Sequence, residues 1–287
     1  MDNSLNTMKG KRLIIVAGPT AVGKTAAAVR LAQELGTEIV SCDSRQFYRE
    51  MDIGVARPSS DELSAVRHHF IACRSVTEPY NIFDYEHDAI ALIMQLFEQY
   101  DTVVAAGGSG LYIDALLHGV SRMPDPTPEL RASLQQMAIE EKRALLLKLD
   151  PEYHAVVDLR NPVRLQRALE VCITSGRPYS SFRTTDIVCR PFACEMNVLE
   201  MEATALRERI DRRVDAMMEA GLLEEVRSLL PYRDLSTLRT VGYRELFLVL
   251  DGAVALDAAV AQIKLNTWHY ARKQLTWLRR YKENRVD

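Results

Sequence analysis

The chain has 287 residues, of which 47% are apolar, and a formal net charge of −3. Length and apolar share fit a globular enzyme of about two structural units, and the slightly acidic balance argues against a general affinity for nucleic acid. No apolar stretch approaches the roughly 20 residues that cross a bilayer, and residues 1–4 resemble neither a secretory signal nor a transit peptide, so we expect no membrane partner and a cytoplasmic location. The five cysteines are odd in number and lack C-x-x-C spacing, which predicts free buried thiols.

The first part of the chain alternates predicted strands and helices. The expected strands are 13–17, 38–42 and 102–106, and the expected helices are 25–35 and 84–99. Continuous apolar strands separated by helices indicate a parallel sheet covered on both faces, with ligands at the carboxyl ends of the strands. We therefore predict an α/β nucleotide-fold core over residues 1–120.

Helices dominate beyond the proline-rich segment Pro124–Pro128. The expected elements are helices over 129–149, 162–175, 204–230, 239–250 and 255–280, and a short strand over 195–199. This pattern predicts a helical insertion domain over residues 121–200. Residues 201–287 are expected to form C-terminal helices that complete the core.

A loop with the pattern G-x-x-x-x-G-K-[ST] lies between the first strand and the first helix, as in a P-loop. Its glycines allow a tight turn that points backbone N–H groups inward, while the helix N-terminus adds partial positive charge and Lys24 adds a full one. The Thr25 hydroxyl would bind Mg²⁺ against the same phosphates. The alternative is a glycine turn that binds nothing. The residues expected to bind a diphosphate or triphosphate are Gly18, Pro19, Thr20, Ala21, Val22, Gly23, Lys24 and Thr25.

Two further polar segments follow predicted strands. Asp43, after the second strand, fits either an acid that positions Mg²⁺ or an acid that accepts a proton from an attacking group. The glycine turn at 107–110 is either a simple strand-to-helix connection or a site where the Ser109 hydroxyl approaches a substrate oxygen. Spacing does not decide between these alternatives.

The C-terminal segment 264–285 is basic and interleaved with aromatic residues such as Trp268 and Trp277. These aromatic side chains could stack on bases, or they could dock an amphipathic helix on the core while its charges face water. From this segment alone, docking is the favoured interpretation.

Taken in order, the motifs resemble the tRNA dimethylallyltransferase family, also called tRNA isopentenyltransferases, in its bacterial form. They span nearly the whole chain, so the resemblance is far more specific than the P-loop alone. The segments that carry it are Gly18–Thr25, Asp43–Tyr48, Met51–Pro58, Gly107–Tyr112, Gln166–Val171, Arg239–Arg244 and Ala271–Trp277.

The resemblance implies transfer of a dimethylallyl group from dimethylallyl diphosphate to N6 of the adenosine immediately 3′ to the anticodon of tRNA, with release of diphosphate. The loop would hold the leaving diphosphate, with Lys24 and a Thr25-bound Mg²⁺ stabilising its charge. Asp43 would orient the adenine amino group and take its proton. Ser109, where the family more commonly has threonine, would contact the diphosphate oxygen that leaves the prenyl carbon. The catalytic residues implied in this way are Lys24, Asp43 and Ser109.

The resemblance also implies a monomer that contacts the anticodon stem-loop of tRNA, partly through the C-terminal helices. Trp268 stands where many members have arginine, so a phosphate-binding role at that position does not carry over. The tRNA-binding residues implied are Asp43, Ser44, Arg45, Gln46, Ser109, Arg131, Gln166, Arg167, Ala168, Leu169, Glu170, Arg239, Thr240, Val241, Gly242, Tyr243 and Arg244.

Other functions share parts of this pattern. An adenylate isopentenyltransferase would use the same donor but prenylate free AMP. A P-loop small-molecule kinase would use the helical insertion as a lid but would not need the basic, aromatic C-terminal segment. A non-catalytic RNA-binding module is a more distant alternative.

Overall fold

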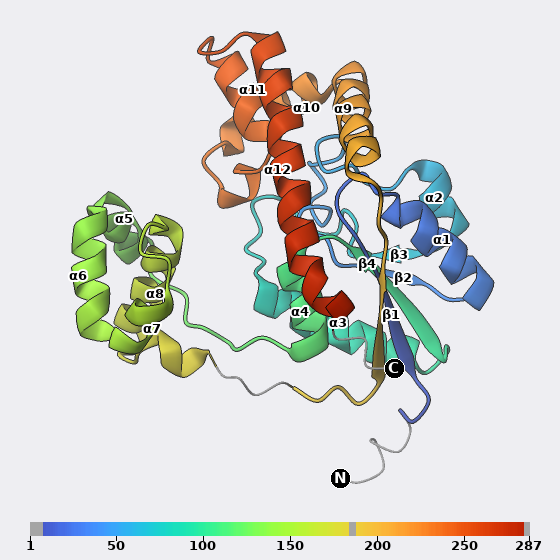
Figure 1. Ribbon diagram of the computed structural model, residues 1–287, viewed down its shortest axis with the longest axis horizontal. Coiled ribbons are helices and arrows are strands. Elements are labelled where there is room, and N and C mark those ends of the chain that lie inside the picture. Colours follow the sequence, from blue (N-terminus) through green and yellow to red (C-terminus); the bar gives the residue numbers. More distant parts are fainter. Residues whose placement is uncertain (1–7, 184–187, 284–287) are drawn as a thin grey trace. The chain divides into compact units, whose positions relative to one another are not determined.

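The computed structural model describes residues 8–183 and 188–283, which form two compact units (Figure 1). The first unit combines residues up to 117 with residues from 190 onward, and the second comprises residues 118–189. The N-terminal residues 1–4, on which part of the expected location rests, and Arg285 of the basic segment lie outside the described residues.

The first unit contains a five-stranded parallel sheet. Its strands are β1 (Arg12–Ala17), β2 (Ile39–Ser41), β3 (His68–His69), β4 (Thr102–Gly107) and β5 (Ala193–Val198). Their order in the sheet is β3-β2-β4-β1-β5, and every neighbouring pair is parallel. The predicted α/β class with a parallel sheet is confirmed. β5 follows the helical unit in the chain and pairs with β1, so it returns the chain to the sheet that β1 to β4 form.

Alternating side chains of the central strands pack into two separate hydrophobic clusters. Leu13 and Ile15 of β1 pack in the cluster that includes the inner face of α3 (Ile82–Leu96), whereas Val16 packs with α1 (Lys24–Leu35). Successive strand side chains point to opposite faces, so α3 and α1 cover opposite faces of the sheet. The short helices α2 (Ser60–Ala65) and α4 (Gly110–His118) complete this part of the chain.

The second unit is helical. It contains α5 (Pro128–Gln136), α6 (Ile139–Leu149), α7 (Pro151–Val156), α8 (Pro162–Ser175) and a 3₁₀ turn, η1 (Tyr179–Phe182). One continuous helix over 129–149 was a wrong prediction, because Ala138 is extended and Glu141 caps the start of α6 by accepting the Ala138 N–H. The insertion predicted over 121–200 differs from this unit at its end, where β5 belongs to the sheet.

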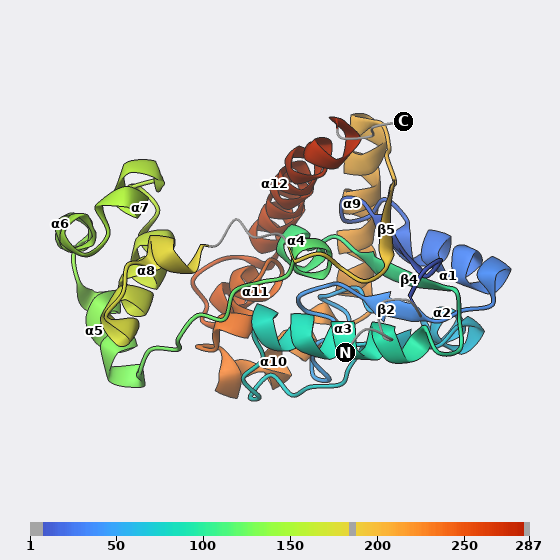
Figure 2. The same ribbon diagram turned by 90° about the horizontal axis from the view of Figure 1, so that it is seen from below.

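The last part of the chain returns to the first unit as helices. They are α9 (Ala203–Glu219), α10 (Leu222–Ser228), α11 (Tyr243–Leu250) and α12 (Leu256–Glu283), with 3₁₀ turns η2 (Leu230–Tyr232) and η3 (Ser236–Leu238). The helix predicted over 204–230 is broken at Gly221, which has a φ of 97°. α9 and α12 lie side by side in both views (Figures 1 and 2), and their apolar side chains pack on Ala21 and Val22 of the P-loop.

Two expectations from composition can be compared with the structure. Among the cysteines, Cys42 and Cys172 are buried free thiols as predicted, but Cys73 and Cys194 are free and exposed. No helix within residues 8–183 and 188–283 is long and apolar enough to cross a membrane.

Candidate active site

The P-loop connects β1 to α1. β1 ends at Ala17 and α1 begins at Lys24, so the loop runs directly into the first turn of the helix. Gly23 has a φ of 102°, a left-handed conformation that glycine adopts without strain. The Lys24 ammonium folds back over the loop and donates to the Pro19 carbonyl oxygen at 2.8 Å. A helix start with a cation held beside it is an anion-binding arrangement.

The ends of β2 and β4 are joined by hydrogen bonds. The carboxylate of Asp43, after β2, accepts the Arg45 N–H at 2.9 Å. The buried hydroxyl of Ser109, after β4, accepts the Ser44 N–H at 3.1 Å and donates to the Ser44 hydroxyl at 3.3 Å. Because β1, β4 and β2 are parallel neighbours, the P-loop, Asp43 and Ser109 follow the same ends of adjacent strands, as the sequence predicts.

A cavity of ≈ 590 Å³ lies at this edge of the sheet. Its volume falls in the range of small-molecule sites. The P-loop and the segment Asp43–Gln46 contribute to its lining, together with residues 54–57, Glu62 of α2, residues 240–242 and the helices α9, α10 and α12. Its charged lining residues are Lys24, Asp43, Arg45, Arg57, Glu62, Arg209 and Arg213, and its larger apolar ones are Val55, Val214, Met217, Leu222, Val241 and Ile263.

Two arginines of α9 reach this cavity, and the sequence analysis did not single them out. Arg209 and Arg213 are four residues apart and therefore share one helix face. Burial lowers the pKa of the Arg213 guanidinium, the Asp43 carboxylate acts in the opposite direction, and Arg209 lowers it further. The cavity thus concentrates positive charge, which favours an anionic ligand. The R-x-x-x-R spacing on a predicted helix was the available signal.

Helix α12 fixes the P-loop relative to the turn after β4. The buried amide of Gln274 accepts the Thr20 N–H at 2.8 Å and donates to the Gly108 carbonyl oxygen at 2.7 Å. A methyl group on Gly108 would lie 2.4 Å from the Gln274 amide nitrogen, so this contact requires glycine. Gln274 therefore positions the P-loop backbone from a segment far away in the sequence.

Burial lowers the pKa of the Lys24 ammonium to about 8, with Asp43 acting in the opposite direction and Arg213 adding to the decrease. Only the charged ammonium attracts a diphosphate. We therefore expect the affinity of the ligand-free protein for a non-reactive donor analogue to fall above about pH 8, by up to about tenfold per pH unit.

The affinity is measured by calorimetric titration from about pH 6 to pH 10 for the wild type and for Lys24→Met. The difference between the two profiles isolates the titration of Lys24, because all other titrating groups of the protein and of the analogue are present in both series. Equal pH profiles for the two proteins would contradict the expectation.

Comparison with known proteins gives a match along nearly the whole chain. Residues 46–281 match the family model described as IPP transferase. The chain belongs to this family. It is 46% identical over 280 residues to the tRNA dimethylallyltransferase of Flavobacterium johnsoniae, covering 94% of this chain and 91% of that protein. It is 45% identical over 277 residues to tRNA dimethylallyltransferase 1 of Bacteroides thetaiotaomicron, covering 95% and 90%. The crystal structure of the full-length tRNA isopentenylpyrophosphate transferase from Bacillus halodurans is 34% identical, with a TM-score of 0.67 over 96% of this chain and 88% of that one.

In this IPP transferase, the residues 239–244 that the resemblance linked to tRNA have different environments. Arg239 and Arg244 are exposed, whereas Thr240 and Val241 line the cavity. Gly242 and Tyr243 are buried, and the Tyr243 hydroxyl donates to Glu225 at 2.6 Å. The Tyr243 ring is 0% exposed and packed in the core, so its side chain is not on the surface, and a contact of this residue with tRNA stays a prediction.

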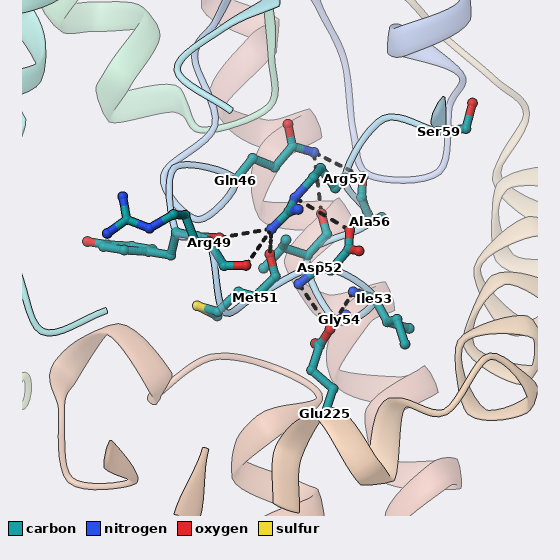
Figure 3. A network of polar contacts seen from close by, with 12 residues as sticks. Gln46, Arg49, Met51, Asp52, Ile53, Gly54, Ala56, Arg57, Ser59 and Glu225 are labelled. Atoms are coloured by element: carbon teal, nitrogen blue, oxygen red, sulfur yellow. Dashed lines mark hydrogen bonds and ion pairs between the residues drawn. The ribbon is translucent and has the colours of Figure 1, made fainter. Parts of the chain in front are cut away.

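The residues 43–46, which follow β2, all line the cavity, but their polar groups have different roles. Gln46 uses its amide within the protein: it donates to the carbonyl oxygens of Val55 at 3.3 Å and Ala56 at 3.0 Å (Figure 3). Its structural role is to hold that neighbouring segment.

In the helical unit, Glu170 is the centre of a polar cluster. Its buried carboxylate accepts the Gln166 amide at 3.0 Å and forms ion pairs with Arg167 at 3.5 Å and Arg131 at 3.7 Å. Arg131 and Arg167 keep part of their guanidinium surface exposed, with side-chain exposures of 56% and 35%. Ala168 and Leu169 are fully buried, so their side chains are not on the surface, and the contacts of these two residues with tRNA stay predictions.

Three aromatic residues of α12 support the docking interpretation, whereas Tyr270 is 42% exposed and lines the cavity. The Trp277 indole N–H donates to Asp114 of α4 at 3.2 Å, and the Tyr281 hydroxyl donates to the same carboxylate. Trp268 packs beside the P-loop cluster, with the Arg207 guanidinium 5.8 Å from its ring centroid. These rings anchor the helix, whereas Arg272, Lys273 and Arg279 are exposed.

Proposed function

We propose that this protein transfers a dimethylallyl group from dimethylallyl diphosphate to N6 of the adenosine immediately 3′ to the anticodon of tRNA and releases diphosphate. The relatives that match it along nearly the whole chain are named tRNA dimethylallyltransferases. The observation that carries the proposal is one cavity lined by the P-loop, the Asp43 carboxylate and a set of apolar side chains. It offers places for an anionic leaving group, a proton acceptor and an uncharged carbon chain.

The reaction breaks the bond between the prenyl C1 and a diphosphate oxygen and joins that carbon to the adenine N6. Lys24, Arg209 and Arg213 stabilise the charge that develops on the departing diphosphate. As the C–N bond forms, the nitrogen becomes positively charged and acidic, and Asp43 accepts its proton. The Ser109 hydroxyl donates to the Ser44 hydroxyl, so a proposed bond from Ser109 to a diphosphate oxygen exchanges this one.

A magnesium ion fits the same site. Thr25 and Asp43 both line a second, smaller cavity of ≈ 40 Å³, together with Ser41, and their oxygen atoms are of the kind that Mg²⁺ prefers. When bound, the ion would supply positive charge against the leaving diphosphate. The Thr25 hydroxyl would hold it, and Asp43 remains either a ligand to this ion or the proton acceptor.

The decisive experiment supplies dimethylallyl diphosphate with a labelled prenyl group and offers tRNA and AMP as acceptors in separate reactions. The proposal expects label in tRNA, at one adenosine of the anticodon loop. Label in AMP alone would establish an adenylate isopentenyltransferase, and phosphate transfer from ATP without prenyl transfer would establish a kinase.

The proposed tRNA surface gives a second test. Arg167 and Arg244 both keep part of their guanidinium surface accessible. Replacing them together by alanine is expected to weaken tRNA binding. It is also expected to reduce the slope of log K against log salt concentration by about 1.4 to 1.8, because counterions are no longer released at two phosphates. Binding of the donor analogue is expected to persist. The matched control is the double replacement of Arg12 and Arg30, which removes the same charge from exposed positions on β1 and α1.

An unchanged affinity and salt slope would remove the RNA-binding role of Arg167 and Arg244. Loss of all binding with a large fall in melting temperature would show instead that their ion pairs with Glu170 and Glu245 are structural.

A further inference from the structure

One wall of the active-site cavity is the loop Asp52–Arg57, called here loop 52–57. Gly54, Val55, Ala56 and Arg57 all line the cavity. Ala56 has a φ of 48°, a left-handed conformation that residues with a side chain rarely adopt, so the loop depends on its surroundings to keep this shape.

The carboxylate of Glu225, on α10, binds the beginning of this loop. One oxygen accepts the N–H groups of Asp52 at 3.0 Å and Ile53 at 2.7 Å, and the other accepts the Gly54 N–H at 3.0 Å (Figure 3). Three successive backbone donors aimed at one anion form the arrangement that proteins use to bind phosphates and carboxylates. Here the anion is a side chain of the protein, and each bond is strengthened by its charge.

Tyr243 completes the contact from a second helix. Its hydroxyl donates to Glu225 at 2.6 Å, and a methyl group on Gly54 would lie 2.6 Å from its ring. Burial and the Glu225 carboxylate raise the pKa of Tyr243, which keeps the hydroxyl protonated as a donor. The Glu225 carboxylate therefore has four donors, and an amide in its place could not accept from all of them.

Two further side chains hold the loop through backbone carbonyl oxygens. The Arg57 guanidinium donates to the carbonyl oxygens of Tyr48 at 3.1 Å, Arg49 at 3.0 Å and Met51 at 2.8 Å. Gln46 satisfies the carbonyl oxygens of Val55 and Ala56. Arg57 thus binds the backbone through one nitrogen of its guanidinium, and it also lines the cavity.

We propose that Glu225 is a positioning residue for prenyl transfer: its carboxylate fixes loop 52–57 as a wall of the cavity in which the two substrates meet. This inference rests on the proposed function. Leu222, three residues before Glu225 on α10, also lines this cavity. The helix that holds the loop therefore contributes directly to the cavity lining as well. A shift of this wall would change the alignment of the reacting atoms without touching the P-loop, and misplacement of about 1 Å can cost about 100-fold in rate.

The test compares the wild type with Glu225→Gln, Tyr243→Phe and the double variant. In Glu225→Gln, we expect the amides of Asp52, Ile53 and Gly54 to exchange with solvent about tenfold faster or more, because they lose hydrogen bonds to a charged group. We expect kcat to fall by about 10- to 100-fold, while binding of inorganic diphosphate stays within about twofold of wild type. The double variant is expected to lose little more than Glu225→Gln, because both changes act through one carboxylate.

Glu86→Gln is the matched control. Glu86 is also a half-buried carboxylate, bonded to Arg190 at 2.5 Å, but it does not line the cavity. It is expected to lower the melting temperature without changing kcat or the exchange of loop 52–57. If kcat falls in proportion to melting temperature in both variants, Glu225 has only a structural role and the proposal is overturned.

Wild-type exchange and wild-type kcat in Glu225→Gln would also overturn it. Should Glu225→Gln fail to fold, Tyr243→Phe decides, because it removes the hydroxyl that holds the same Glu225 oxygen that accepts the Gly54 N–H. Faster Gly54 exchange with a lower kcat supports the proposal, and wild-type values for both refute it. The exchange measurement needs no substrate. A wild-type protein that transfers no prenyl group would overturn the proposed function, whereas exchange alone still shows whether Glu225 holds the loop.

Discussion

Replacement of Lys24 by alanine is expected to lower single-turnover prenyl transfer by about 10²- to 10³-fold, the cost of removing one preorganised donor from a charge that develops in the transition state. The Lys24 ammonium is held over the P-loop by Pro19 and shares the cavity with Arg209 and Arg213. The two arginines retain part of the attraction for diphosphate, so we expect the loss to be larger in the rate of bond breaking than in donor affinity.

The same replacement is not expected to destabilise the ligand-free protein. Burial lowers the pKa of Lys24 from 10.5 to about 8, which means that folding disfavours its charged form below that pH. Removing the charge therefore relieves a cost of folding at neutral pH. Thermal unfolding of the variant checks this expectation.

Lys11→Ala is the control for Lys24→Ala. Lys11 precedes β1 at the opposite end of the strand, where its ammonium bonds to Tyr100 and Asp101. Its replacement is expected to leave prenyl transfer unchanged. A transfer rate near that of the wild type in Lys24→Ala would remove the proposed role of this cation.

Local sequence patterns predicted the centre of the fold well. The apolar runs of β1 and β4 and the glycines between β1 and α1 act over short distances, so they are visible without the structure. The two-residue β3, His68–His69, carries no apolar run and is a strand only because β2 lies beside it. The breaks at Met137–Ala138 and Gly221 were missed because helical periodicity continues across them.

The candidate site divides in the same way. The P-loop and Asp43 lie in compact motifs whose chemistry can be read from neighbouring residues. Gln274 bonds to Thr20 across 254 positions, and Glu225 bonds to Asp52 across 173. Such contacts depend on how the C-terminal helices fold back on the sheet. The segment Ala271–Trp277 carries the family resemblance but does not reveal what Gln274 binds, and nothing in the local sequence distinguishes Glu225 from an ordinary polar residue on a helix surface.

The second large effect is expected from Asp43→Asn. Asparagine retains the size of the side chain and an oxygen that can accept the Arg45 N–H, which lies 2.9 Å from the Asp43 carboxylate, but it cannot take a proton. We expect the single-turnover rate to fall by about 10²- to 10⁴-fold, as for other positioned general bases. The affinity for tRNA is expected to change much less, because one carboxylate contributes little to a large RNA contact.

Asp101→Asn supplies the control for a lost carboxylate, because Asp101 is exposed and pairs with Lys11 before the strands begin.

Asp43→Asn also separates the two roles that the position of Asp43 allows, proton acceptor and metal ligand. Beside Thr25, the carboxylate could bind Mg²⁺, and a lost ligand is compensated by mass action at high metal concentration, whereas a lost proton acceptor is not. The rate of Asp43→Asn is therefore measured across a wide Mg²⁺ series. A rate that stays low at saturating Mg²⁺ supports the proton acceptor, and recovery to the wild-type rate would assign Asp43 to the metal instead.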